Sequence, residues 1–262
     1  MEDRKEAMNM KGFLCEDTVE GIFTGVFDAW VSGMEIGHEN VRLFLKRQYE
    51  PELFFEYEEV FPDEDKAEKV ARTIRKKISG EAFRRVYRTA MSSQPDRADA
   101  IYRFLMEGFR YKEDTLRMLQ LPAVGRVFEL ARKVANEAHL FLEFVRFEQL
   151  KNGVLFAVIA PKSNVLTLVA PHFEDRFSGE NWIIYDETRA LAAVHEALKP
   201  YALARLTEEQ AGVFLDRNKE NDGYTDLWKV FFNTIGIEDR KNHRCQRTMM
   251  PLWYRKHMTE FL

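Results

Sequence analysis

The spacing of apolar residues changes near residue 142, and this change most constrains the fold. Before it, apolar residues recur every three or four positions, as in helices that bury one face. After it, residues 145–150 and 154–160 are strand-like, and Asn152-Gly153 between them is a strong hairpin signal. A chain that is helical first and then forms hairpins is predicted to be of the α+β class.

The first half is predicted to be mainly helical. We expect helices over residues 18–30, from Pro62, after Gly80 and from near Pro95, with an edge strand over residues 53–61. A long helix should run from Pro122 to about residue 142. We therefore divide the chain into a mainly helical N-terminal part, residues 1–121, and an α+β part, residues 122–262. The two parts can form one compact body, because no linker precedes Pro122.

The second half is predicted to hold a small antiparallel sheet. A short helix over residues 165–169 should follow the first hairpin, with a restart at Pro171. Residues 181–186 and 189–195 read as a second hairpin, which gives a β-β-α-β-β unit. An amphipathic helix over residues 224–235 is expected to run into a basic tail.

Several protein classes are disfavoured. The first residues are polar, and the longest apolar run, residues 154–161, is far below the roughly 18 residues that span a membrane. The two cysteines, Cys15 and Cys245, form no CxxC pair, so we expect a reducing cytoplasmic location and no iron–sulfur or thiolate zinc site. Walker A, GxGxxG, HExxH and GxSxG motifs are absent. We expect neither a cofactor nor a metal, and no membrane partner.

Charge is distributed unevenly along the chain. Residues 1–60 carry 14 acids and 6 bases, whereas the remainder carries 29 acids and 33 bases. This asymmetry would orient an anionic partner toward the later part of the chain.

The C-terminal segment is the first candidate for nucleic-acid binding. Residues 240–258 contain six Lys or Arg, two His and no acid. Arg240, Arg244 and Arg247 would share one helix face, where guanidinium groups suit phosphates, and Trp253 or Tyr254 could stack on a base. The alternative is a solvated helix end with Trp253 docked in the core.

The second candidate lies around residues 170–177. A helix there would anchor itself by Phe173 and Phe177 and present His172 beside Arg176. With Asp186 and Arg189 at the ends of the second hairpin, these groups could clamp a phosphate or hold a general acid or base. The alternative is a structural ion pair of Asp186 with Arg189 or Arg176.

Two further clusters favour structural interpretations. Glu137 and His139 do not share a helix face, so His139 should pair with Glu143, and Arg146 lies beyond them. Two consecutive helices expose a possible phosphate-backbone contact, which we call the basic face. It is defined by Arg72, Arg75, Lys76, Lys77, Arg84, Arg85 and Arg88. Glu64 and Glu68 lie close enough to offset it, so the sequence favours a plain solvated surface over a phosphate-backbone contact.

Nearly the whole chain carries short pieces in a distinctive order and spacing: residues 18–21 with Phe27, Lys66-Ala67 with Val70, residues 137–139 with Arg146-Phe147, residues 170–173 with Arg176-Phe177, Trp182 with Asp186 and Arg189, Arg240 with Asn242 and Gln246, and Met250-Pro251 with Tyr254. In these pieces the chain resembles a bacterial family labelled "probable DNA metabolism protein", of unknown function. The family resembles the partner of a radical-SAM DNA repair or modification protein, and a related domain is fused to uracil-DNA-glycosylase-like domains. It offers no established catalytic residues.

The resemblance implies a DNA repair or modification accessory protein that binds DNA or a damaged nucleotide beside such a partner. The residues we assign to nucleic-acid or phosphate binding are Arg146, Arg176, Arg189, Arg240, Asn242, Arg244, Gln246, Arg247, Trp253 and Tyr254. One alternative is an enzyme acting on a nucleobase or nucleotide, with His172 as acid or base and Asp186 as its partner. Another is an interaction protein whose acidic N-terminal half docks a basic partner.

Overall fold

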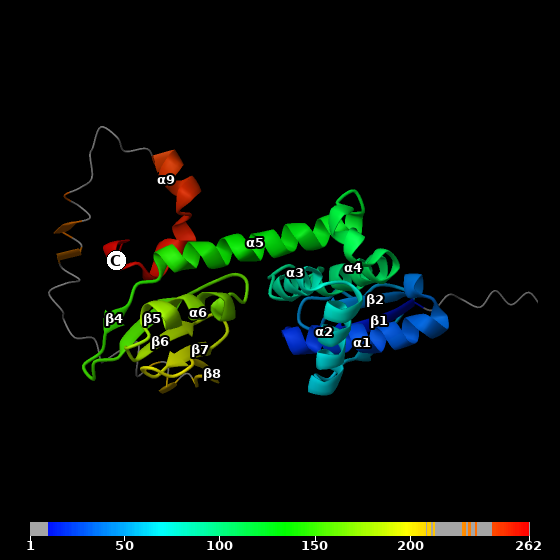
Figure 1. The fold of residues 1–262 in the computed structure, drawn as a ribbon, viewed down its shortest axis with the longest axis horizontal. Helices are drawn as coiled ribbons and strands as arrows, with labels where there is room; N and C mark the ends of the chain where they lie inside the picture. Colours follow the sequence, from blue (N-terminus) through cyan, green and yellow to red (C-terminus); the bar gives the residue numbers. More distant parts are fainter. Residues whose placement is uncertain are drawn as a thin grey trace, which may run out of the picture. The chain divides into compact units, whose positions relative to one another are not determined.

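The computed structural model describes residues 10–207 and 243–261, together with residues 209, 210, 212, 227, 228, 230, 231 and 234. The chain forms two compact units, and the boundary between them, at Ala135 and Asn136, lies inside helix α5 (Pro122–Phe144) (Figure 1). Most of the helix expected over residues 224–235 lies outside the described residues. The α+β class is confirmed, with 55% of the described residues in helices and 17% in strands.

The first unit contains a three-stranded parallel sheet. Its strands are β1 (Met10–Cys15), β2 (Val41–Leu45) and β3 (Phe55–Glu59), in the order β2-β1-β3. The edge strand expected over residues 53–61 is therefore confirmed. Strands β1 and β2 were not expected, because β1 is buried without alternation and a run as short as β2 cannot be told from a piece of helix by its period.

Helices α1 (Val19–Ile36), α2 (Glu64–Lys77), α3 (Gly80–Ala90) and α4 (Arg97–Tyr111) complete the first unit, with short 3-10 helices at His38–Asn40 and Lys112–Arg117. Three of them begin at a capping side chain. Thr18, Asp63 and Ser79 each accept a hydrogen bond from the backbone N–H three residues on. Such caps satisfy N–H groups that a helix start leaves unpaired, so these helices begin close to the positions that the sequence predicts.

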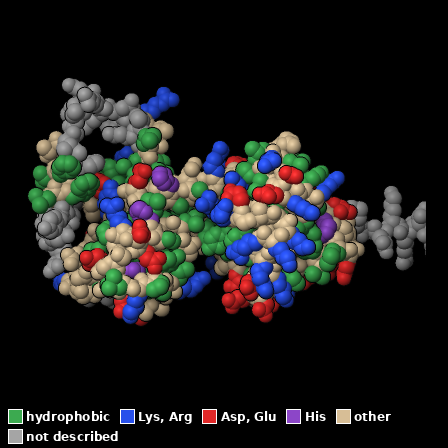
Figure 2. Space-filling model, viewed as in Figure 1, with side chains coloured by type: hydrophobic (Ala, Val, Ile, Leu, Met, Phe, Trp, Pro, Cys, Tyr) green, Lys and Arg blue, Asp and Glu red, His purple; other side chains and the backbone are tan. Residues whose placement is uncertain are grey.

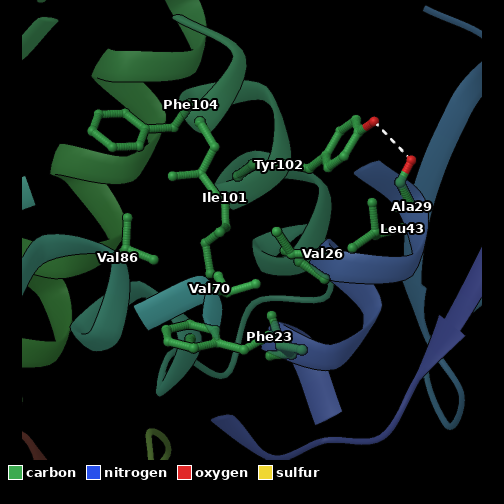
Figure 3. Packing of buried hydrophobic residues seen from close by; sticks show 14 of the residues in the cluster. Phe23, Val26, Ala29, Leu43, Val70, Val86, Ile101, Tyr102 and Phe104 are labelled. Carbon is green, nitrogen blue, oxygen red and sulfur yellow. Dashed lines mark hydrogen bonds between the residues drawn. The ribbon is translucent and has the colours of Figure 1, made fainter. Parts of the chain in front are cut away.

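The core of the first unit lies where these helices meet the sheet. Figure 3 shows side chains of α1, β2, α2, α3 and α4 packed together, and the Tyr102 hydroxyl donates a hydrogen bond of 3.1 Å to the Ala29 carbonyl. On α2 the stripe of Ala67, Val70 and Ile74 is buried. No helix among the described residues combines the length and apolarity needed to cross a membrane.

The second unit is built on a five-stranded sheet. Its strands are β4 (Glu148–Gln149), β5 (Leu155–Ile159), β6 (Trp182–Asp186), β7 (Leu191–His195) and β8 (Ala202–Arg205), in sequence order across the sheet. Helix α6 (Leu166–Arg176) joins β5 to β6. Helix α9 (His243–Met249) and two 3-10 helices, η4 (Leu252–His257) and η5 (Thr259–Phe261), end the described chain.

Both predicted hairpins are present, but the sheet is not wholly antiparallel. Strands β5 and β6 pair in parallel, and β8 adds a fifth strand beside β7. The expectation of an antiparallel sheet was wrong for the pair β5 and β6. Helix α6 carries the chain back to the end of the sheet where β5 begins, so β6 runs in the same direction as β5.

The predicted helix restart at Pro171 was also wrong. Helix α6 runs through Pro171 without a break. Packing outweighs the missing hydrogen bond, because Ala170 and Phe173 on either side are buried. The rings of Phe173 and Phe177 both contact Phe147, which confirms that this aromatic pair anchors the segment.

Candidate nucleic-acid interface

The basic face is formed by the C-terminal half of α2 and by α3. Residues 64–90 hold nine Lys and Arg against four Asp and Glu. Figure 2 shows Lys and Arg side chains gathered over α2. Positions 72 and 76 lie opposite the stripe that α2 buries, so their side chains extend into solvent. The buried stripe therefore fixes which cations this surface presents.

Acidic side chains neutralise only part of the basic face. Arg72 pairs with Glu68, and Glu81 pairs with both Arg84 and Arg85. The hydrogen bond from Arg84 and the charges of Arg85 and Arg88 hold the pKa of Glu81 below its ordinary value despite partial burial. Within the described part of the chain, Arg75, Lys76, Lys77 and Arg88 have no ion-pair partner. Arg75, Lys76 and Lys77 therefore remain available to an anion, and Glu81 offsets the charge of Arg88 only in part.

The guanidinium group of Arg75 is held by an aromatic ring. Its central carbon lies 3.5 Å from the centroid of the Phe83 ring. Stacking fixes the plane of the group while leaving its N–H donors at the rim, which is the geometry that binds phosphate oxygens. The helices thus order at least one cation of the basic face in advance.

The aromatic residues of the C-terminal segment are largely turned into the second unit. Tyr254 is buried, and its ring contacts Phe141 and Phe144 of α5 at centroid distances of 5.0 and 5.2 Å. Burial raises the pKa of the Tyr254 phenol. Trp253 is half-buried, stacked on Tyr254 at 3.7 Å, and the Lys162 ammonium lies 5.1 Å from its ring. This geometry agrees with the alternative given above, in which Trp253 docks against the core.

Arg146 is held by a partner within its own unit. Its guanidinium group lies 2.7 Å from the Glu260 carboxylate, whose side chain is 2% exposed. Burial alone would raise the pKa of Glu260, but hydrogen bonds from Arg146 and its own backbone hold it below its ordinary value. Arg146 also lies over the Trp228 ring. This arginine joins α5 to the C-terminal segment.

Asp186 and Arg189 form an ion pair at the end of β6. The distance between them is 3.0 Å, and the Asp186 side chain is fully buried. Arg189 also donates to the carbonyls of Pro161 and Lys162. Burial raises the pKa of Asp186, and Arg189 offsets this effect only in part. The pair closes the loop after β5 onto the turn after β6.

The helix α6 side chains do not join that pair. His172 and Arg176 are exposed, and Arg176 lies over the Phe177 ring. Among the described residues, the hydrogen-bond partners of Asp186 are Thr188 and Arg189, and His172 is not one of them. The structure thus brings Asp186 and Arg189 together and leaves His172 and Arg176 on the surface.

Helix α9 presents two of the described cations of the tail. Arg244 and Arg247 are exposed. Gln246 lies in the same helix, but its side chain, together with Arg240 and Asn242, is outside the described residues. The face that Arg244 and Arg247 share is consistent with their i, i+3 spacing.

Two carboxylates organise the second unit in ways that the sequence did not reveal. Glu137 is buried and accepts hydrogen bonds from the backbone N–H groups of Lys162 and Ser163. Glu187 pairs with Lys256 and lies 3.1 Å from His257. These contacts join segments far apart in the chain, and a single sequence carries no local signal for them. The predicted pair of His139 with Glu143 is present at 3.6 Å.

A family described as "domain of unknown function (DUF4130)" matches residues 95–260, which is more than half of the chain. The chain belongs to the DUF4130 family. The DUF4130 region begins at α4 and includes α5, the five-stranded sheet and the C-terminal segment. The basic face on α2 and α3 lies outside it.

Similarity to other known proteins is weak. No curated protein matches the chain. One solved chain, described as the DHH domain of a member of a family of ribosomal proteins, is 11% identical and covers 72% of this chain and 74% of its own length. Its TM-score of 0.28 carries no argument about fold or function.

Proposed function

We propose that this protein binds nucleic acid through the basic face, with the phosphate backbone as the contacted group. The observation that carries this proposal is the set of four cations, Arg75, Lys76, Lys77 and Arg88, that lack an acidic partner within the described chain. On a solvent-exposed helix, the charge of a Lys or Arg is commonly offset by an Asp or Glu one turn away. Here Glu68 and Glu81 form ion pairs with Arg72, Arg84 and Arg85, and the charge of Arg88 acts on Glu81 without an ion pair.

The second unit would add phosphate contacts of its own. Arg244 and Arg247 are exposed on α9, and Lys162 lies beside the half-buried Trp253. Backbone contacts of this kind supply affinity without sequence preference, so recognition of a particular lesion would need a further component.

The family resemblance suggests what that component is. We propose that the protein works in DNA repair or modification beside a radical-SAM or glycosylase-type partner, as an accessory that holds the DNA. In this proposal the partner would carry out the reaction, and this chain would bind the phosphate backbone of the DNA.

Fluorescence anisotropy tests the binding step directly. Labelled single-stranded, duplex, uracil-containing and abasic DNA are titrated with the protein at about 50 and about 200 mM salt. We expect binding at low salt that weakens steeply at high salt, because each neutralised phosphate releases a counterion. Failure to bind any of these probes at low salt would remove the nucleic-acid role.

A matched pair of variants locates the surface. In Arg75→Gln with Lys76→Gln, the slope of log K against log salt on duplex DNA should become shallower by about 0.9 for each phosphate that the protein no longer neutralises. The control is Arg132→Gln with Lys133→Gln, which removes two adjacent exposed cations from α5. Equal losses of affinity in both variants would indicate a diffuse charge effect and not a binding face.

A further inference from the structure

Strand β3 leaves one edge of the first sheet without a neighbour. It pairs with β1 alone among the described strands. The Phe54 carbonyl accepts from Met10 of β1 and the Val60 N–H donates to Leu14 of β1, so the even-numbered residues direct their backbone groups toward β1. Backbone direction alternates along a strand, and the N–H and C=O groups of Phe55, Tyr57 and Glu59 therefore point outward. They form roughly 17 Å of free edge.

Large apolar side chains flank this edge. Leu53 and Phe54, directly before β3, are 84% and 81% exposed, and Phe61, just after it, is 73% exposed. Phe54 adopts a positive φ of 68°, which bulky residues rarely do. Exposed apolar side chains beside an unpaired strand edge are unfavourable in an isolated protein and often mark a protein–protein contact. Residues with a strained backbone likewise cluster at sites that bind ligands.

The two faces of β3 differ in chemistry. Glu56 and Glu58 are exposed on one face. On the other, Phe55 and Tyr57 are half-buried, and both rings contact Phe44. A strand added at this edge would set its own alternate residues against these two faces. Its chemistry is thereby specified: cationic residues facing the glutamates, alternating with apolar residues facing the aromatic side.

A second copy of this chain is a poor occupant. Pairing β3 with itself would place the glutamates of one copy beside those of the other, and like charges opposite each other on a sheet are destabilising. Lys11 and Lys46 already pair with Glu58 and Glu59 at 2.7 Å, but these two glutamates remain about half exposed. The acidic residues therefore disfavour self-association through this edge and favour a cationic partner.

We propose that the β3 edge is a docking site for a protein partner that adds an extended segment of alternating Lys or Arg and apolar residues, with Leu53 and Phe54 as apolar anchors. This site is separate from the basic face in residues and in charge, and it does not depend on nucleic-acid binding. Main-chain hydrogen bonds would give affinity, and the alternating side chains would give specificity.

The probe is a blocked ten-residue peptide of alternating lysine and valine, titrated against the full chain at low salt. A peptide of alternating glutamate and valine is its charge control, and the lysine peptide with N-methyl groups on alternate residues is its backbone control. We expect the lysine peptide to bind at least about tenfold more tightly than either control. Absence of measurable binding, or equal binding of the N-methylated peptide, would overturn strand addition at this edge.

Two charge-reversed variants identify the surface. Glu56→Lys with Glu58→Lys should weaken binding of the lysine peptide by about tenfold and strengthen binding of the glutamate peptide, since the complementary charge is reversed. Glu180→Lys with Glu196→Lys reverses two exposed acids in the second unit and should leave both affinities unchanged. If both variants respond equally, bulk charge and not the β3 edge determines binding.

Amide hydrogen exchange gives a readout independent of affinity. The lysine peptide should slow exchange at Phe55, Tyr57 and Glu59, whose N–H groups point outward. Exchange at Glu56 and Glu58, already directed at β1, should change little. Protection of other residues with none at these three amides would contradict the proposal.

A pair of apolar truncations tests the proposed anchors. Leu53→Ser with Phe54→Ser should weaken binding of the lysine peptide, because both side chains stand exposed beside the edge. Leu198→Ser, which removes a side chain that is also 84% exposed at a positive φ, should leave that affinity unchanged. An equal effect of the two changes would remove Leu53 and Phe54 from the docking site.

Discussion

The Glu137 carboxylate accepts a hydrogen bond of 2.6 Å from the backbone N–H of Lys162. Its second oxygen accepts from Ser163 at 3.1 Å. One buried side chain of α5 thus satisfies two consecutive N–H groups in the loop that follows β5. That loop also receives Arg189, so its conformation depends on contacts from two distant segments.

Glu137→Gln should destabilise the protein. The amide nitrogen of glutamine cannot accept, so one buried N–H loses its partner, at a cost of about 1–3 kcal/mol in the free energy of unfolding. Urea denaturation followed by circular dichroism measures the change. Glu143→Gln is the control, because Glu143 is exposed on the same helix and, within the described residues, its side chain pairs with His139 alone, over 3.6 Å. A destabilisation as large in the control would show that the capping contact is not responsible.

Asp186 should make stability depend on pH in an unusual direction for a carboxylate. Burial raises its pKa in the folded protein above the value of 3.8 for an exposed group. The folded state therefore binds this proton more tightly than the unfolded state does. The contribution is fully present below pH 3.8 and is lost as pH rises through the folded-state pKa.

Asp186→Asn isolates that contribution. As pH rises above about 4, the unfolding free energy of wild type should fall relative to that of the variant, because only wild type must ionise a buried group. Urea titrations at several pH values from about 4 to about 7 measure it. A difference that is flat over this range, or that shifts in favour of wild type, would contradict the raised pKa.

Tyr254 and Trp253 should respond differently to truncation. Tyr254→Ala removes a buried ring packed on Phe141 and Phe144, and we expect a loss of about 3–5 kcal/mol in stability. Trp253→Ala, at a half-buried position, should cost clearly less. Thermal unfolding ranks the two variants. A larger loss for Trp253 would mean that the indole, not the phenol, anchors the C-terminal segment.

Arg244→Ala with Arg247→Ala should weaken nucleic-acid binding without unfolding the protein. Both side chains are exposed on α9, and alanine preserves helix propensity. We expect weaker binding at low salt and a salt slope shallower by about 0.9 for each duplex phosphate left unneutralised, measured by fluorescence anisotropy. Circular dichroism and the melting temperature serve as the folding control. Unchanged affinity in a folded variant would remove α9 from the interface.

Arg146→Ala should lower the free energy of unfolding, whatever its effect on nucleic-acid binding. Its partner Glu260 would become a buried charge without compensation, a change that typically costs about 3–5 kcal/mol. Arg176→Ala removes an exposed arginine of the same unit and should leave the unfolding free energy nearly unchanged. Denaturant midpoints of the two variants distinguish these outcomes.

Local sequence signals determined the starts of three helices and the turn of the first hairpin. Thr18, Asp63 and Ser79 cap their helices where the apolar period begins, and Gly153 takes the positive φ that the first hairpin requires. Each of these features depends on residues within a few positions of one another, so one sequence is enough to predict it.

Tertiary structure decided the rest. The parallel pairing of β1 with β2 and of β5 with β6 joins strands separated by whole helices. The contacts of Glu137 with Lys162 and of Arg146 with Glu260 span 25 and 114 residues. Whether an arginine meets a phosphate or a buried glutamate depends on which distant segment folds against it, and no local period or spacing encodes that choice.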